Sequence, residues 1–271
     1  MEMSNNLIVV PFDFTPMSYQ AIEHGACLAM AMEKKLLLLH VAGKESEIPA
    51  LEKKLQIIVD ECLETYQLQP EFKIVKGSRP YATIKTAAEE LNAALVILKT
   101  GGIRGIKRYT GIRTIKILSG SLVPFVVIQD APKNATLQNI VFPINFLGEH
   151  DTKLKRVVFF SRFYPDATMH IITPSGKDTD KEKIIASNIK VMTKALEDQN
   201  IKVNFITHDH TKNKAELIIA AAKEANADMI MTPTENVPTA IKFLFGLREE
   251  KLISNAEKIP VMCVHASLQF L

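Results

Sequence analysis

Short apolar runs alternate with longer amphipathic segments along the whole chain. The runs are apolar at nearly every position and are bounded by polar residues, glycine or proline, which is typical of strands covered on both faces of a sheet. In the first half they predict strands at Leu7–Pro11, Lys35–Val41, Glu71–Val75, Ala94–Leu98 and Pro124–Ile128. In the second half they predict strands at Asn139–Phe142, Thr168–Ile172, Val203–Thr207, Asp228–Met231 and Pro260–Val264.

The amphipathic segments repeat apolar residues every three or four positions and therefore predict helices between the strands. The expected helices are Ser18–Met32, Ile48–Leu68, Tyr81–Leu91, one beginning near Thr110–Ile112, His150–Phe163, Asp180–Gln199, Lys214–Ala225 and Lys242–Ala256. Strands separated by helices imply right-handed crossovers and a parallel sheet. The sequence predicts an α/β fold of two doubly wound domains, each with five parallel strands and helices on both faces.

The second half repeats the plan of the first. Asn6–Phe14 aligns with Gln138–Phe146 at an offset of 132 residues, and Ala87–Thr100 aligns with Ala221–Thr234 at an offset of 134. A third match, between the last strands of the two halves, has an offset of 136. Because three matches occur in the same order with little drift, we interpret the chain as a tandem duplication whose seam is the polar stretch Asp130–Thr136. The expected domains are residues 1–133 and 134–271.

Composition excludes several classes of protein. With 47% apolar and 23% charged residues in 271, the chain is neither disordered nor collagen-like. Its three cysteines are far apart and odd in number, which predicts no disulfide framework and no zinc site and favours a reducing compartment. No apolar run reaches the ~18 residues of a membrane helix, and Met1–Asn6 is too polar for a signal peptide. We therefore expect a cytoplasmic protein without a membrane partner.

Glycines and positive charge coincide after the fourth strand. Ligands of doubly wound folds bind at the carboxyl ends of the strands, where this loop lies. The window from Leu91 to Gln129 holds six basic and no acidic residues, so the remainder of the chain sums to −3 although the whole carries +3. Successive glycine N–H groups can converge on an anion. The loop predicts a phosphate-facing segment, and the alternative is a solvated basic loop; the residues concerned are Lys99, Thr100, Gly101, Gly102, Arg104, Gly105, Lys107, Arg108, Gly111, Arg113 and Lys116.

Asp13 stands at the end of the first strand, two residues after Pro11. Its carboxylate could accept a hydrogen bond from an adenine amino group or a ribose hydroxyl. Alternatively it caps the following helix, a role open also to Thr15 and Ser18. Its counterpart in the second half, Asn145, has lost the charge, so we do not expect the same contact there.

Together these residues resemble the universal stress protein family, in tandem form. The resemblance rests on the V-x-Pro-x-Asp pattern from Val9 to Asp13, on a second strand ending in His40-Val41, on the ALVIL strand with its glycine loop and on the PFVV strand. It implies a strand order of 3-2-1-4-5 and no defined enzymatic reaction. In one branch of the family it also implies ATP bound through a G-x2-G-x9-G-[S/T] loop, with Asp13 and Val41 at the nucleoside.

The loop matches that pattern only in part. Lys99 stands where the first glycine is expected, Gly102 matches the second, and Gly111 follows after eight residues instead of nine. Ile112 replaces the Ser or Thr after it. In the second half the corresponding residues are Pro233, Asn236, Gly246 and Leu247. Only one of three glycines remains there, so we expect any nucleotide site in the first half alone.

The leading hypothesis is a stress-response binding or regulatory module with a modified site for ATP or another phosphate ligand, accompanied at most by Mg²⁺. The alternatives are a protein-interaction module that binds no nucleotide and, less favoured, a slow ATPase. No hydrolase, metalloprotease or P-loop motif occurs, and neither a resident metal nor a specific nucleic acid is expected. The candidate site residues are Pro11, Asp13, Val41, Thr100, Gly102, Arg104, Gly105, Lys107, Arg108 and Gly111.

The last strand of each half predicts how the halves associate. An apolar strand at the edge of a sheet exposes unpaired backbone groups and favours pairing with another strand. We expect Pro124–Gln129 and Pro260–His265 to pair antiparallel and form an internal pseudo-dimer. Assembly of the full chain into a homodimer stays open.

Overall fold

The computed structural model describes residues 6–99, 121, 123–143, 157–158, 161, 164, 166–174, 179–208, 214–234 and 251–265. Its strands are β1 (Leu7–Pro11), β2 (Lys35–Ala42), β3 (Glu71–Lys76), β4 (Leu95–Lys99), β5 (Phe125–Ile128), β6 (Asn139–Pro143), β7 (Thr168–Pro174), β8 (Val203–His208), β9 (Met229–Thr234) and β10 (Val261–His265). Its helices are α1 (Pro16–Ala31), η1 (Glu45–Glu47), α2 (Ile48–Tyr66), α3 (Pro80–Glu90), α6 (Thr179–Glu197) and α7 (Lys214–Glu224).

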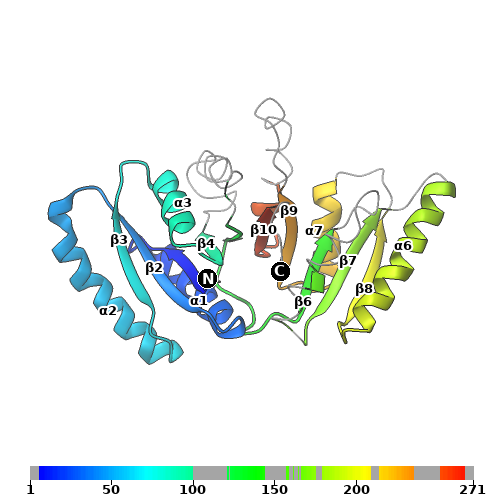
Figure 1. The fold of residues 1–271 in the computed structure, drawn as a ribbon, viewed down its shortest axis with the longest axis horizontal. Coiled ribbons are helices and arrows are strands. Elements are labelled where there is room, and N and C mark those ends of the chain that lie inside the picture. The colour runs from blue at the N-terminus through cyan, green and yellow to red at the C-terminus, as the bar shows by residue number, and fades with distance from the viewer. Residues whose placement is uncertain are drawn as a thin grey trace.

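All these strands join one ten-stranded sheet in the order β3-β2-β1-β4-β5-β10-β9-β6-β7-β8 (Figure 1). Neighbouring strands are parallel within each half, and β5 and β10 pair antiparallel, with Val126 opposite Met262. The order 3-2-1-4-5 therefore holds in the first half and recurs in the second. The expected fold class and the expected pairing of the two last strands are both confirmed.

Two hydrophobic cores cover the faces of this sheet. Alternation along β1 sends Ile8 and Val10 to one core and Val9 to the other, because successive strand side chains point to opposite faces. The first core includes residues of α1, α2 and α6, and the second includes residues of α3 and α7. Both cores contain residues of β5 and of β10. Apolar packing is thus continuous across the seam on both faces, which makes this pairing part of the core.

The described elements agree with the expected ones to within three residues at each end. β7 extends to Pro174 and β9 to Thr234 because their parallel neighbours continue the ladder past the apolar run. α1 begins earlier than expected, with Pro16 in its first turn, where the fixed φ of proline suits a helix. The helix expected near residue 110 lies outside the described residues.

Two further expected helices are described only in part: residues 157, 158 and 161 of one, and residues 251–253 of the other, are helical. The domain boundary near residue 133 stays a prediction. Among the described residues, no helix combines the length and the apolar character that crossing a membrane requires.

Candidate functional site

Asp13 lies just beyond the carboxyl end of β1 and is exposed. Its Oδ1 accepts hydrogen bonds from the Thr15 amide at 3.1 Å and from the Thr15 hydroxyl at 2.6 Å. Thr15, not Asp13, is the N-cap residue of α1, and Ser18 donates its hydroxyl to the Thr15 carbonyl at 2.8 Å. Asp13 therefore shapes the turn before the helix instead of capping it. Its exposed carboxylate remains in a position to meet a ligand.

The next residue, Phe14, has a left-handed backbone conformation, with φ of 63°. For a residue other than glycine such a conformation costs about 1–3 kcal/mol and persists only where the surroundings impose it. The Phe14 ring packs edge to face against the Phe12 ring, with the ring centroids 5.1 Å apart. The centroid of the His40 ring, on β2, also lies 5.1 Å from that of the Phe14 ring. Tyr19 of α1 packs on Phe12 at 5.2 Å. An aromatic cluster thus adjoins the Asp13 carboxylate at the ends of β1 and β2.

His40 and Lys54 complete this cluster. His40 Nδ1 lies 2.7 Å from the Phe12 carbonyl, which can only accept, so the ring donates its Nδ1 proton there. This contact satisfies the His40 ring at Nδ1 and gives it a structural role. Lys54 of α2 holds its ammonium 5.9 Å from the centroid of the Phe14 ring, within the range of a cation–π contact. The cluster offers an acceptor, a cation and aromatic rings, which are groups that bind a ligand.

Only three of the expected site residues fall within the described chain. Pro11 ends β1, Asp13 follows it, and Val41 stands near the end of β2, partly buried against the core on the α3 face. Pro11 pairs with Leu39 of β2, so the structure brings the ends of β1 and β2 side by side. The other seven lie outside the described residues: Thr100, Gly102, Arg104, Gly105, Lys107, Arg108 and Gly111.

Lys99, where the family pattern expects glycine, is the last residue of β4. Its ammonium donates to Gln20 Oε1 of α1, and Gln20 Nε2 in turn lies 3.4 Å from Asp130 Oδ1. Partial burial lowers the pKa of Lys99. Asp130 also accepts from Lys258 at 2.6 Å, so this network links β4 and α1 to the second half. The side chain of Lys99 therefore has a structural partner.

His24 on α1 belongs to the same seam. Its Nε2 lies 2.9 Å from the Asp130 carbonyl oxygen, and the side chain is only 6% exposed. Because a carbonyl oxygen only accepts, Nε2 carries the proton of a neutral ring. Burial lowers the pKa of His24 from 6.5 to about 4, against the opposing effect of this hydrogen bond. The imidazole is neutral at pH 7, as its place in the packing requires.

We predict that acid weakens the fold through His24. The pKa of His24 is lower in the folded chain than in the unfolded chain. Between pH 6.5 and pH 4 the unfolded chain therefore binds more protons than the folded chain, and the free energy of unfolding decreases as the pH is lowered. The loss attributable to His24 between pH 7 and pH 5 should be about 2 kcal/mol. Urea unfolding of the wild type and of His24→Gln at both pH values measures it. Equal pH dependence in the two proteins would contradict the prediction.

Of this cluster the sequence predicted only Asp13 as a site residue; it did not predict Phe12, Phe14, Tyr19, His40 or Lys54. Phe14 gave one signal, the Phe-x-Phe spacing around Asp13, but its left-handed backbone has no local signature. Lys54 gave none, because forty residues separate it from Phe14 and only the packing of α2 brings them together. Among the described residues, no group of three or more His, Cys, Asp or Glu side chains is arranged to hold a metal ion.

Comparison with known proteins places this cluster in a family domain. Residues 5–129 match the model of the universal stress protein family. A search of curated proteins found no match to the sequence. The fold resembles that of a universal stress protein from Archaeoglobus fulgidus with a TM-score of 0.72, 17% identity and coverage of 96% of each chain.

Two other solved structures span the chain. A functionally unknown protein from Pseudomonas aeruginosa has a TM-score of 0.68 and 15% identity, covering 97% of this chain and 93% of its own. The cytoplasmic domain of a prokaryotic cation chloride cotransporter has a TM-score of 0.55 and 13% identity, covering 97% and 96%. At these identities the likeness concerns the fold alone. The similarity to the universal stress protein family concerns residues 5–129, and the likeness of the fold extends over the whole chain.

Proposed function

We propose that this protein is a tandem universal stress protein that acts as a stress-response binding or regulatory module, with a modified ATP or phosphate-ligand site in its first half only. The observation that carries the proposal is the exposed Asp13 carboxylate beside a strained Phe14, at the carboxyl end of β1 within the family domain. Strain held by the surrounding structure is common at ligand sites.

The chemistry of the first half supports a nucleotide ligand. Asp13 Oδ1 is engaged by Thr15, and a carboxylate has acceptor capacity on both oxygens for an amino group or a hydroxyl. The partly exposed Phe14 ring supplies a surface on which a planar base can stack. The sequence of the following loop supplies glycines and basic residues for phosphates. A nucleotide with its nucleoside at the ends of β1 and β2 and its phosphates toward the loop would use both sets of groups.

The second half has lost the corresponding residues. Pro233, within β9, stands where the family pattern expects a glycine and has no N–H to offer a phosphate. Asn145 replaces the acidic residue at the first strand. The second half contributes β10 to the central pairing instead, so its role in this proposal is to complete the sheet. We expect one nucleotide per chain.

Replacing Asp13 with asparagine should weaken nucleotide binding about tenfold, or about 1.4 kcal/mol, because the side chain keeps its size but loses the charge of the acceptor. Isothermal titration calorimetry with ATP, ADP and AMP measures this. Gly102→Val should also weaken binding, because it adds a branched side chain to the loop that is proposed to face the phosphates. Asp60→Asn, at an exposed position of α2, is the matched control and should bind like the wild type. Equal affinities of Asp13→Asn and Asp60→Asn would remove Asp13 from the site.

The second candidate is a protein-interaction module that binds no nucleotide, and Lys99 favours it. Where the family pattern has glycine, this chain has a lysine whose ammonium donates to Gln20. Gln20 in turn contacts Asp130, which accepts from Lys258 of the second half. If none of the three nucleotides binds at millimolar concentration, this second function replaces the first. The slow ATPase is tested separately: phosphate release above the buffer control would establish it, and we expect none.

A further inference from the structure

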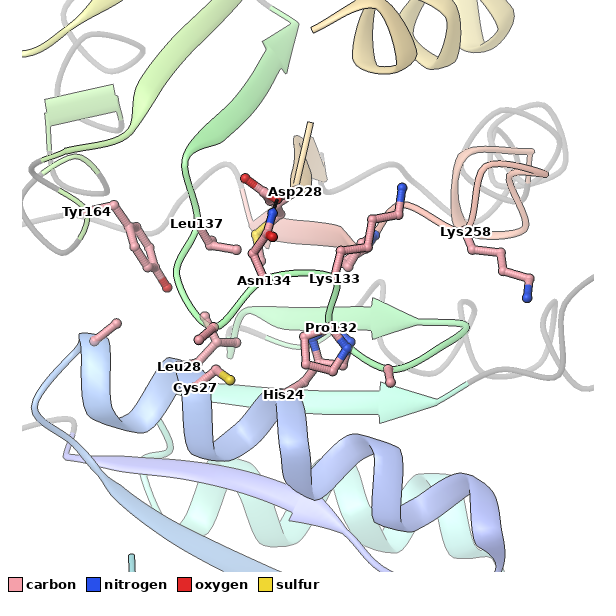
Figure 2. A pocket seen from close by; sticks show the side chains of 15 residues that line it. His24, Cys27, Leu28, Pro132, Lys133, Asn134, Leu137, Tyr164, Asp228 and Lys258 are labelled. Atoms are coloured by element: carbon pink, nitrogen blue, oxygen red, sulfur yellow. Dashed lines mark hydrogen bonds between the residues drawn. The ribbon is translucent and has the colours of Figure 1, made fainter. Parts of the chain in front are cut away.

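A small cavity lies at the seam of the two halves (Figure 2). Its volume is about 30 Å³, which is room for about two waters, since one water takes roughly 10–15 Å³. The Tyr164 hydroxyl in its lining is buried without a hydrogen-bond partner among the described residues, and a water can accept its proton. The Lys258 ammonium, from the same lining, is already paired with Asp130 at 2.6 Å. The cavity is therefore suited to hydration of the seam and not to a ligand.

The helices α2 and α6 are the outermost elements at the two ends of the long axis of the molecule (Figure 1). They hold equivalent places, because each follows the second strand of its half and packs beside an edge strand, β3 or β8. The twist of the long sheet turns their outer faces toward opposite ends of the molecule (Figure 1). These two faces therefore cannot meet within one chain, and each is open to another molecule.

The outer face of α2 combines an apolar side chain with acidic ones. Ile57, Glu61 and Glu64 follow one another at i, i+4 and i+7, so they share one face of the helix. Ile57 is 57% exposed, and both glutamates are exposed. Neither glutamate has an ion-pair partner among the described residues, so both charges are available to another molecule.

The outer face of α6 combines apolar side chains with basic ones. Ile184 and Val191 lie seven residues apart on one face and are 50% and 66% exposed. Lys190 and Lys194 stand on either side of Val191 along the helix, and both are exposed. Within the described part of the chain, neither ammonium has a carboxylate partner. This face thus offers the same kind of apolar surface as α2 with the opposite charge.

The apolar side chains of the two faces are spaced so that they can interlock. If α2 of one molecule lies along α6 of another with Ile57 midway between Ile184 and Val191, the three side chains bury one another, as when the ridge of one helix fills the groove of its neighbour. Because every α-helix rises by the same amount per residue, this placement also fixes which of the other residues come level.

In that register a parallel orientation brings opposite charges together. Glu61 comes level with Lys190, and Glu64 with Lys194, each to within two residues along the axis. An antiparallel orientation instead brings both glutamates to the start of α6, where the first turn is itself acidic. Both helices run in the same direction across the view in Figure 1, so successive copies along the long axis meet with the two helices parallel.

We propose that copies of this chain associate head to tail, with α6 of one copy on α2 of the next. The glutamates of α2 pair with the lysines of α6, and the exposed apolar side chains of both helices leave water between them. Because the two faces differ, each added copy leaves one face of each kind open, and assembly continues beyond the dimer. The contact involves one helix from each copy and belongs to the small, weak class of interfaces. Neither Asp13 nor any part of the proposed nucleotide site takes part.

Sedimentation of the full chain tests the association. We expect the weight-average mass of the wild type to rise as its concentration increases from about 10 µM to about 500 µM, the range in which a weak interface forms. Raising the NaCl concentration from about 10 mM to about 1 M shortens the screening length from roughly 30 Å to roughly 3 Å and should restore the monomer. A wild type that stays monomeric at the highest concentration in low salt overturns the proposal.

Two charge-reversal variants identify the faces. The double variant Glu61→Lys, Glu64→Lys makes both outer helices basic, and Lys190→Glu, Lys194→Glu makes both acidic. Each alone should stay monomeric where the wild type associates, because like charges then meet. An equal mixture of the two should associate again, because every basic face then finds an acidic one. Association of either variant alone, or a mixture that stays monomeric, overturns the proposal.

The matched control is the double variant Glu90→Lys, Glu224→Lys. It changes the net charge as much as the reversal on α2 does, but its positions are exposed on α3 and α7, which cover the other face of the sheet. It should associate like the wild type. A control that is as monomeric as the α2 variant would trace the effect to net charge and would also overturn the assigned faces.

Discussion

Replacing Asp228 with alanine should lower the free energy of unfolding by about 4 kcal/mol, because it leaves three partly buried donors without a charged acceptor. Asp228 directly precedes β9, and its side chain is 7% exposed. Oδ2 accepts the backbone amides of Gln138 and Asn139 at 2.7 and 2.9 Å, at the entry to β6. Oδ1 accepts the side-chain amide of Asn134 at 2.6 Å. One carboxylate thus holds the connector against the second half.

Urea unfolding followed by circular dichroism measures this effect. Asp228→Asn is the matched variant: it keeps one oxygen acceptor and replaces the other with an amide NH2 group, which only donates, so it should lose about half as much stability. Glu224→Ala, an exposed carboxylate at the end of α7, should change stability by less than about 0.5 kcal/mol. A loss below about 1 kcal/mol in Asp228→Ala would contradict the assigned role.

Replacing Gly25 with valine should cost about 3 kcal/mol or more, because α1 lies too close to the sheet at this point for a branched side chain. A Cβ atom on Gly25 would meet Leu36 Cδ1 and Val10 Cγ2, each at 2.8 Å. Both neighbours are buried strand residues in the core beneath α1. Valine would add two further methyl groups to a space that is already filled, so the helix or the strands must shift.

Gly25→Ala separates crowding from helix propensity. Alanine gains about 1 kcal/mol over glycine within a helix, and this gain offsets part of the contact with Leu36 and Val10. We therefore expect a smaller loss than for valine, measured by urea unfolding. Gly43→Ala is the control in open space, since the nearest atom to its Cβ is Glu47 Oε2 at 3.8 Å. Stability of Gly25→Val within about 1 kcal/mol of the wild type would show that α1 adjusts freely.

Hydrophobic periodicity predicted most of the fold because both element types have a local signature. Continuous apolar runs predicted β1 and β5, and the i, i+3, i+4 pattern predicted α2 and α6, in each case near the observed ends. The later end of β7 came from a long-range pairing: Pro174 joins β7 only because His208 stands beside it on β8. No pattern within a segment reports such a neighbour.

The candidate site divides in the same way. Asp13 was predictable because the end of a strand can be located from the sequence, and strand ends are where such folds bind ligands. The aromatic cluster was not, since it depends on β2 and α2 arriving beside β1. Tyr164 was not predictable as part of a cavity either, because residues of the first half complete the lining beside it.

By itself, the sequence determined the alternation of strands and helices and the position of Asp13 at a strand end, since each depends on residues close together in the chain. The tertiary structure alone decided that the carboxylate of Asp228 organises the connector and that a cavity at the seam gathers groups from both halves. Contacts at the seam join residues far apart in the chain, such as Asp130 and Lys258, paired at 2.6 Å across 128 residues. Contacts of this kind arise from packing in three dimensions, which leaves no periodic trace along the chain.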